Sequence, residues 1–154
     1  MIDPRSDIIG LFTNSRIGAD SRYSGTSVYI KIVSTEDNEN TEPNDYGDKY
    51  VGILWLKPPR QYLNDLTISF TVTEHEAIVD CDLIIPRNDK WLKNNHSTFI
   101  NNIVDLFERT IRENSTTSGK TWDIAMVDNI LVSVDVENPN IYRRLMELRC
   151  YKAD

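Results

Sequence analysis

Cysteine is scarce in this chain of 154 residues, which has only Cys81 and Cys150. Two cysteines so far apart in the sequence do not build a disulfide framework, and they lack the close spacing of a zinc knuckle. Both lie in segments where apolar residues alternate with polar ones, and free cysteine is among the most buried residue types. We therefore expect two buried thiols.

Long apolar runs are also missing. The longest, from Ala77 to Pro86, is interrupted by Asp80 and Asp82, and a membrane helix needs ~18 apolar residues. The first residues, 1–7, lack the basic region and the apolar stretch of a secretion signal. These features predict a soluble protein that is intracellular when made and has no membrane association.

Basic residues are outnumbered, since 17 Lys and Arg stand against 24 Asp and Glu, a net charge of −7. This balance argues against a basic groove that would hold a phosphate backbone. The 40% hydrophobic and 27% charged content is ordinary for a globular protein. The length fits one domain, and we expect residues 1–154 to form it.

Alternating apolar and polar residues predict several strands. In the segment 77–85 every odd position is apolar, whereas Asp80 and Asp82 occupy even positions and should face outward or toward a partner. A tight connection at Glu74–Glu76 should precede this strand, and Pro58-Pro59 should end an earlier one. The expected strands are 26–33, 50–56, 66–73, 77–85, 122–126, 130–136 and 141–152.

Two helices are expected. Asp3 can cap a short helix that has Pro4 at its first position and ends before Asn14. Apolar residues at three- and four-residue steps from Phe99 to Ile111 mark a long amphipathic helix, beginning at Ser97 or as early as Asp89 and ending near Asn114. The order of elements predicts an α+β fold: a mostly antiparallel β-sheet with the long helix packed on one face and a short N-terminal helix.

Residues 34–49 form an acidic segment between two predicted strands, and they are interpreted as a hairpin arm. A hairpin connection usually has 2–5 residues, so this one is long. Its acids do not have the spacing of a calcium-binding loop. Two interpretations stay open: a solvated hairpin tip, or an arm that orders against a neighbouring subunit. The acids are Glu36, Asp37, Glu39, Glu42, Asp45 and Asp48.

No pattern in the chain indicates a catalytic centre, a cofactor or a metal. Gly119-Lys120-Thr121 lacks the earlier glycine of a phosphate-binding loop, because Asn114 occupies that position. His75 and His96 have no supporting ligand spacing. Asp80 and Asp82 could form an acid–base pair, but pairing with Arg143, Arg144 or Arg149 across the sheet, or exposure to water, is the preferred explanation.

The C-terminal half has a characteristic order of elements. The run Phe99–Asn114 is followed by Trp122-Asp123, by an Ile- and Val-rich strand, and by Asn140-Ile141-Tyr142-Arg143 leading into a terminal strand. This arrangement, with the N-terminal helix and the strands between, is similar to the tail-terminator or tail-completion (neck) proteins of tailed bacteriophages. The resemblance spans most of the chain.

The resemblance implies a structural protein of the virion, assembled in the host cytoplasm, and not an enzyme. Members of that family form a homo-oligomeric ring, often a hexamer, that caps the tail tube and joins it to the head connector, with DNA passing transiently through the lumen. The second hypothesis is a small protein-binding accessory or regulatory domain. The third is an enzyme acting on nucleotides or small molecules.

Charged residues on outward strand faces suit complementary contacts between identical neighbours. We therefore expect subunit or partner contacts at Glu36, Asp37, Glu39, Glu42, Asp45, Asp48, Asp80, Asp82, Arg143 and Arg149.

Overall fold

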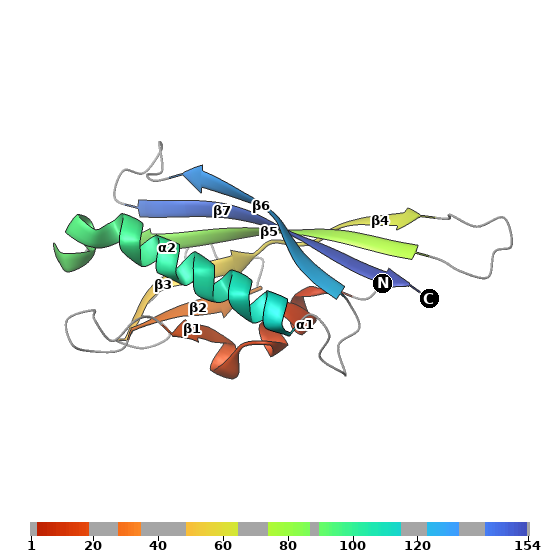
Figure 1. The fold of residues 1–154 in the computed structure, drawn as a ribbon, viewed down its shortest axis with the longest axis horizontal. Helices are drawn as coiled ribbons and strands as arrows, with labels where there is room; N and C mark the ends of the chain where they lie inside the picture. Colours follow the sequence, from red (N-terminus) through yellow and green to blue (C-terminus); the bar gives the residue numbers. More distant parts are fainter. Residues whose placement is uncertain are drawn as a thin grey trace, which may run out of the picture.

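The computed structural model describes residues 3–18, 28–34, 49–64, 74–86, 90–114, 123–132 and 141–153. It has two layers: a β-sheet, and helices lying against one face of that sheet (Figure 1). The fold is α+β and the sheet is mostly antiparallel, which confirms the predicted class. The elements are α1 (Arg5–Gly10), the 3-10 turn η1 (Thr13–Ser15), β1 (Arg16–Gly18), β2 (Tyr29–Val33), β3 (Tyr50–Leu56), β4 (Arg60–Asn64), β5 (Glu74–Pro86), α2 (Lys90–Glu113), β6 (Asp123–Val132) and β7 (Ile141–Ala153).

Two long strands, β5 and β7, form the centre of the sheet. Each has 13 residues, and they pair antiparallel along their whole length, from Glu74 opposite Ala153 to Pro86 opposite Ile141. The strand order is β1-β2-β3-β5-β7-β6, and β4 pairs with β5 beside this path. Among the described strands, only β2 and β3 are parallel; the other neighbouring pairs are antiparallel.

The parallel pairing of β2 and β3 corrects one prediction. A hairpin arm at 34–49 would have made these strands antiparallel, whereas the connection must return the chain to the end of the sheet where β2 began. A parallel connection needs a dozen or more residues, which explains why this one is too long for a hairpin. Residues 35–48, with the six acids, lie outside the described part of the chain.

Pro58-Pro59 interrupts a strand without ending its partnership with β5. Leu56 pairs with Cys81 and Arg60 with Ile78, so three residues of this segment, 57–59, lie opposite two of β5. The prolines donate no hydrogen bond, and such residues are tolerated at a bulge. The predicted end of the strand before Pro58 is confirmed, because β3 ends at Leu56. The strand β4, which begins at Arg60 against the same edge of β5, was not predicted.

Other boundaries also differ from the predicted ones. Residues 74–76 belong to β5 and are not a connection, because β4 and β7 pair with them on both sides and outweigh the weak strand preference of Glu. The segment 123–132 is one strand, β6, with a register shift between Met126 and Asp128. The strand predicted at 66–73 lies outside the described residues, as do residues 133–136.

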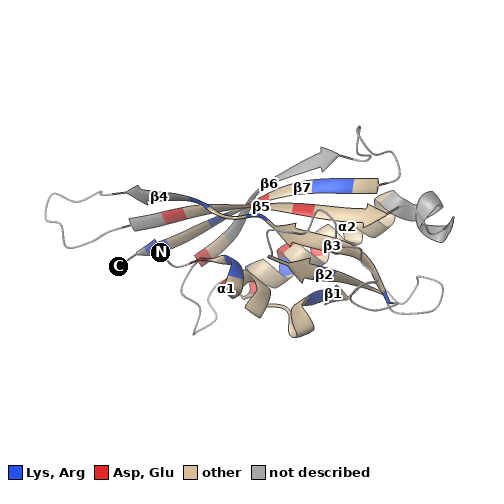
Figure 2. Ribbon diagram, turned by 180° about the vertical axis from the view of Figure 1, so that it is seen from behind, with Lys and Arg blue, Asp and Glu red and all other residues tan. Residues whose placement is uncertain are grey.

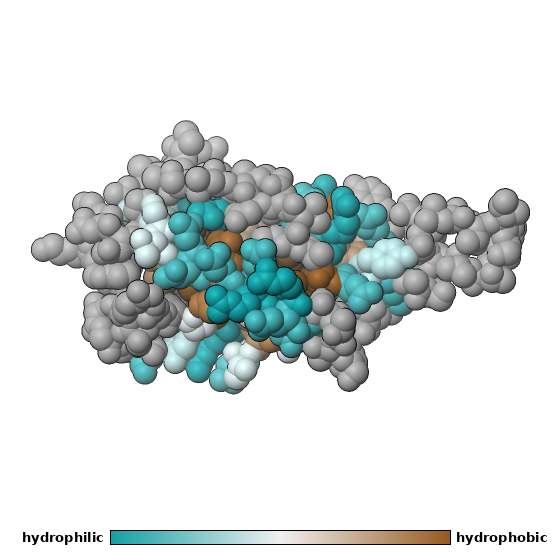
Figure 3. All heavy atoms as spheres, viewed as in Figure 1, coloured by the Kyte–Doolittle hydropathy of each residue, from teal (hydrophilic) through white to brown (hydrophobic). Residues whose placement is uncertain are grey.

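The long helix α2 begins near the earlier of the two predicted starts and ends one residue before Asn114. Its polar side faces away from the sheet and forms part of a hydrophilic surface (Figure 3). Its apolar side packs on the sheet face that carries the odd positions of β5. The buried helix residues are Phe99, Ile100, Ile103, Val104, Phe107 and Ile111, and the odd positions Ala77, Val79, Cys81, Leu83 and Ile85 are at most 1% exposed.

The short helix α1 completes the same layer. Asp3 Oδ1 accepts a hydrogen bond from the backbone N–H of Arg5 (2.9 Å). The cap position itself is Pro4 and the helix begins at Arg5, one residue later than predicted, because Asp3 lies just before the cap. Ile8 is fully buried, and the Phe12 ring stacks on Phe107 with centroids 5.4 Å apart. Both helices therefore share one apolar core with one face of the sheet.

Gly52 lies opposite Ile30 of β2 and close to Ile84 and Ile85 of β5. A Cβ atom at this position would stand 2.8 Å from Ile30 Cδ1, 2.9 Å from Ile85 Cγ1 and 3.0 Å from the Ile84 carbonyl oxygen. These distances are shorter than normal carbon contacts, and one of the neighbours is backbone. Only glycine fits here without displacing the sheet.

We predict that Gly52→Ala lowers the free energy of unfolding by about 1–3 kcal/mol, the usual cost of overpacking. The matched control is Gly10→Ala at the end of α1, where an added Cβ meets nothing within 4 Å. The control should be neutral or slightly stabilising, by up to about 1 kcal/mol. Urea denaturation of the three proteins measures both effects, and equal stabilities would contradict the close approach.

Candidate functional site

The sheet face turned away from α1 and α2, called the outer face below, is the most distinctive surface of the described structure. Figure 2 shows it with no described helix in front of β3, β5 and β7. Strand register assigns to it Lys31, Val33, Ile53, Trp55, Ile78, Asp80, Asp82, Ile84, Arg143, Leu145, Glu147 and Arg149. Val33, Ile53 and Ile78 are buried here, yet they stand outside the main core cluster.

Asp82 and Arg143 form an ion pair at the centre of the outer face. The Arg143 Nε atom donates to both carboxylate oxygens of Asp82, at 2.8 and 3.0 Å, and its Nη2 atom donates to Oδ2. Lys57 Nζ lies 4.0 Å from the same carboxylate. The Asp82 side chain is 0% exposed, whereas that of Arg143 is 31% exposed, so the guanidinium covers the carboxylate.

A second group of charges lies beside this pair. Arg60 Nη2 contacts Asp80 Oδ1 at 3.0 Å and Glu147 Oε2 at 3.5 Å. Arg149 Nε contacts Glu76 Oε1 at 2.7 Å, and the Arg149 side chain is about half exposed. These charges are near the surface, where an ion pair stabilises a protein by only ~0–1 kcal/mol.

Asp80, Asp82, Arg143 and Arg149 share the outer face, as strand alternation predicted, and each has a partner within the chain. Asp82 differs from the expectation in one respect, because Arg143 shields it completely from solvent and from any neighbour. The interpretation of these acids as partners of arginines across the sheet is confirmed for Asp82 with Arg143. Their role in subunit contacts stays a prediction.

Arg144 is a charged residue whose burial the sequence analysis did not identify. It is 7% exposed on the helix side of β7, and its Nη2 atom donates to Asn101 Oδ1 of α2 at 2.9 Å. Burial lowers the pKa of its guanidinium below the ordinary value, opposed by the charge of Asp105. Its even position in β7, between Tyr142 and Met146, was the signal that placed it on the apolar face.

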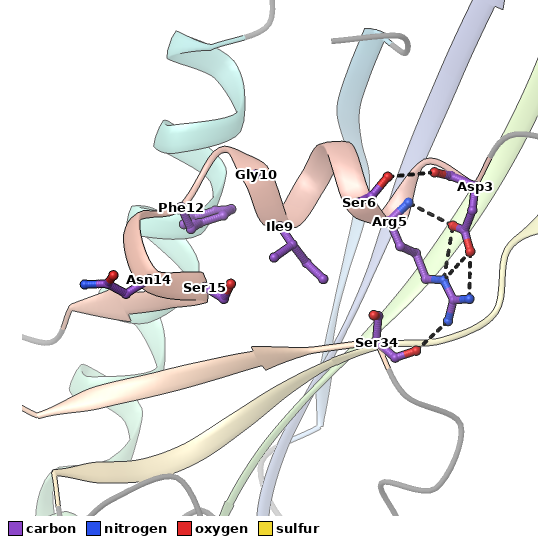
Figure 4. A pocket seen from close by; sticks show the side chains of 9 residues that line it. All are labelled: Asp3, Arg5, Ser6, Ile9, Gly10, Phe12, Asn14, Ser15 and Ser34. Carbon is purple, nitrogen blue, oxygen red and sulfur yellow. Dashed lines mark hydrogen bonds and ion pairs between the residues drawn. The ribbon is translucent and has the colours of Figure 1, made fainter. Parts of the chain in front are cut away.

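A pocket of about 440 Å³ lies between α1, η1 and the end of β2 (Figure 4). Arg5 donates to Asp3 inside it and also to the Ser34 carbonyl oxygen, at 2.8 Å. Burial raises the pKa of Asp3, but hydrogen bonds from the Arg5 side chain and backbone outweigh it, and the pKa lies below its ordinary value. These two charges are engaged with each other, and the rest of the lining combines the apolar Ile9 and Phe12 with serine side chains and Asn14.

Both cysteines are buried in the core, as predicted. Burial raises the pKa of the Cys81 thiol well above its ordinary value, and it raises that of Cys150 to about 12. A thiol reacts through its thiolate, so neither cysteine is activated as a nucleophile.

The remaining candidate motifs are only partly described. Gly119-Lys120-Thr121 lies outside the described residues. The backbone places His75 within β5 and His96 within α2, not at a turn and a helix start as predicted. Among the described residues, no group of three or more His, Cys, Asp or Glu side chains is arranged to hold a metal ion. No described helix has the length and apolar character needed to cross a membrane.

Comparison with protein-family models, with curated proteins and with solved structures finds no match to this chain.

The buried ion pair yields a stability prediction. Arg143→Met should lower the free energy of unfolding by about 3–5 kcal/mol, because the Asp82 carboxylate is left buried without its main partner. The double variant Asp82→Leu/Arg143→Met should recover most of that loss, since an apolar pair has no desolvation cost.

Arg149→Met is the matched control, because it breaks an exposed pair on the same strand and should cost at most about 1 kcal/mol. Chemical denaturation of the four proteins provides the measurement. A double variant that is as unstable as Arg143→Met alone would show that the pair contributes more than compensation of buried charge.

Proposed function

We propose that this chain is a structural subunit of a tailed-phage virion, which assembles into a homo-oligomeric ring at the neck, caps the tail tube and joins it to the head connector. One observation carries the proposal. Both helices cover the same face of the sheet, and the outer face is left without a described covering layer although it contains buried apolar residues. A surface of this kind suits contact with other protein subunits.

The composition of the outer face supports assembly. Trp55 and Leu145 are half-buried, and they lie on either side of Asp82 in the paired strands β3, β5 and β7. Aromatic residues are enriched at protein–protein interfaces, where they combine apolar area with few rotatable bonds. The surrounding ion pairs supply charges of both signs, which allow complementary contacts between identical copies.

The order of elements also supports the phage family. The structure has a short N-terminal helix, strands, one long helix and two final strands, the arrangement on which the resemblance rests. A ring requires an interface that joins two different patches of the subunit, and its closure by rotation fixes the number of copies. In this proposal DNA contacts the protein only while passing through the ring.

The native mass of the purified protein tests this proposal. We expect light scattering coupled to size exclusion to give a discrete mass that is a multiple of 17.8 kDa and corresponds to about six copies. Leu145→Lys should reduce the ring fraction, because it places a charge in the apolar part of the outer face. Arg109→Glu, at an exposed position of α2, is the control and should leave the ring unchanged.

A protein that stays monomeric at every concentration, and also in the presence of purified tail tubes, would contradict the ring. That result would favour the alternative of a protein-binding accessory domain.

The acidic segment 34–49 requires a length-preserving test. Deletion of 36–48 would leave three residues to connect two parallel strands, which is too few, so its effect would report on folding. Neutralising Glu36, Asp37, Glu39, Glu42, Asp45 and Asp48 to the corresponding amides keeps the length and the side-chain shape. If these acids contact a neighbouring subunit, the ring should dissociate at a higher protein concentration than the wild type.

The control neutralises three acids of α2, Asp105, Glu108 and Glu113, and should not change the dissociation concentration. A ring that becomes tighter after neutralisation of the 34–49 segment would show that its charges only repel each other.

A further inference from the structure

The two ends of the sheet are different surfaces. β1 and β6 stand at opposite ends of the strand order, and each pairs with a single described strand. β6 is ten residues long and contains no Lys, Arg, Pro or Gly. Natural proteins usually protect such an edge with charged side chains, especially lysine, or with proline, because its free N–H and C=O groups accept another strand. The β6 edge has none of the basic or proline residues that would prevent pairing.

The two edges carry opposite charge. In β1, Arg16 lies opposite Lys31 of β2 in the strand register, so this edge carries two cations, and Lys31 Nζ donates to the Asn14 carbonyl oxygen at 3.4 Å. The Arg16 guanidinium is held 3.9 Å above the Tyr29 ring. The charged residues of β6 are Asp123, which is exposed, and Asp128. Opposite charges on neighbouring strands attract and like charges repel, so an acidic strand suits the β1 edge and a second copy of β6 does not suit β6.

We infer that the β6 edge of one copy of this chain pairs with the β1 edge of the next copy. The inference rests on the proposed ring and specifies its subunit contact. Opposite charges favour this head-to-tail pairing over pairing of β6 with β6, which would give a closed dimer. A contact between two different patches repeats from copy to copy, as a ring requires.

Strand direction defines the geometry of the contact. Going across the sheet from β1 to β6, the strand direction reverses at each of the four antiparallel pairs and stays the same at the parallel pair β2–β3. Four reversals restore the original direction, so β1 and β6 run the same way. A neighbour related by rotation about an axis along the strands therefore pairs in parallel. β1 has three described residues, so the contact is short and leaves room for further contacts by the outer face.

Site-directed crosslinking tests the contact. Gly18→Cys in β1 is suitable, because an added Cβ would meet only Tyr29 Cε1, at an ordinary 3.9 Å. It is combined with Ala125→Cys and, separately, with Ile130→Cys in β6, and a short bis-maleimide allows for either register. The native thiols Cys81 and Cys150 are buried and have raised pKa values, so the wild type should give no product.

We expect a double variant to give a ladder of covalent oligomers that ends at the mass of the native ring, while each single variant stays uncrosslinked. Dimers from Ala125→Cys alone would show that β6 pairs with itself and would overturn the inference. A native ring that gives no ladder from either double variant would also overturn it and leave the proposed ring intact. A chain that stays monomeric with and without tail tubes overturns both.

Charge reversal provides an independent measurement. Arg16→Glu, or Asp123→Lys/Asp128→Lys, should raise the dissociation concentration about two- to five-fold per interface, the effect expected of a cross-strand charge pair. The variant with all three changes restores opposite charges and should return toward the wild-type value. If the combined variant weakens the ring by the sum of the effects of the β1 and β6 variants, the two edges do not meet.

Discussion

The antiparallel pairing of β5 with β7 is the constraint on which the rest of the structure depends. The residues that these strands pair are between 55 positions (Pro86 and Ile141) and 79 positions (Glu74 and Ala153) apart in the chain, and β3, β4 and β6 all attach to them. Their shared apolar face receives both helices. The six buried residues of α2 pack in the core cluster to which both of these strands contribute, together with residues of α1, β1, β2 and β3.

The register of the pairing is held on both faces at once. A slip of one residue would turn every side chain of a strand to the other face of the sheet. A slip of β5 would carry Asp82 into the apolar core and away from Arg143, and a slip of β7 would bring Arg144 out of contact with Asn101 of α2. The cost of burying an unpaired charge thus adds to the loss of apolar contacts. Charged residues on both faces give the sheet a single stable alignment.

The sequence predicted the parts of the fold that repeat with a regular period. Alternation in 77–85 and 141–152 identified β5 and β7, and the three- and four-residue spacing from Phe99 to Ile111 identified α2. It could not predict the parallel pairing of β2 with β3, because strand direction depends on the path of a connection and not on the strands themselves. The resumption of the sheet at Arg60, after two prolines, depends on the partner strand and left no local pattern.

The outer face was predicted only in part for a related reason. Alternation correctly placed Asp80, Asp82, Arg143 and Arg149 on one surface, but alternation reports the side of a sheet and not the depth of a residue. Asp82 is buried because Arg143, 61 residues later, lies diagonally across from it on the neighbouring strand and is long enough to cover it. Only the strand register contains that information.

The position of the helices determines how this chain can associate. A sheet covered on one face leaves three surfaces for contact: the outer face and the two edges. The outer face has most of its charges neutralised within the chain, so its attraction for a neighbour comes from apolar area such as Trp55 and Leu145, which has no direction. The edges supply direction, because backbone hydrogen bonds form only in register and the opposite charges of β1 and β6 distinguish one edge from the other. Association that combined the two would have affinity from the face and geometry from the edges, and a closed ring needs both.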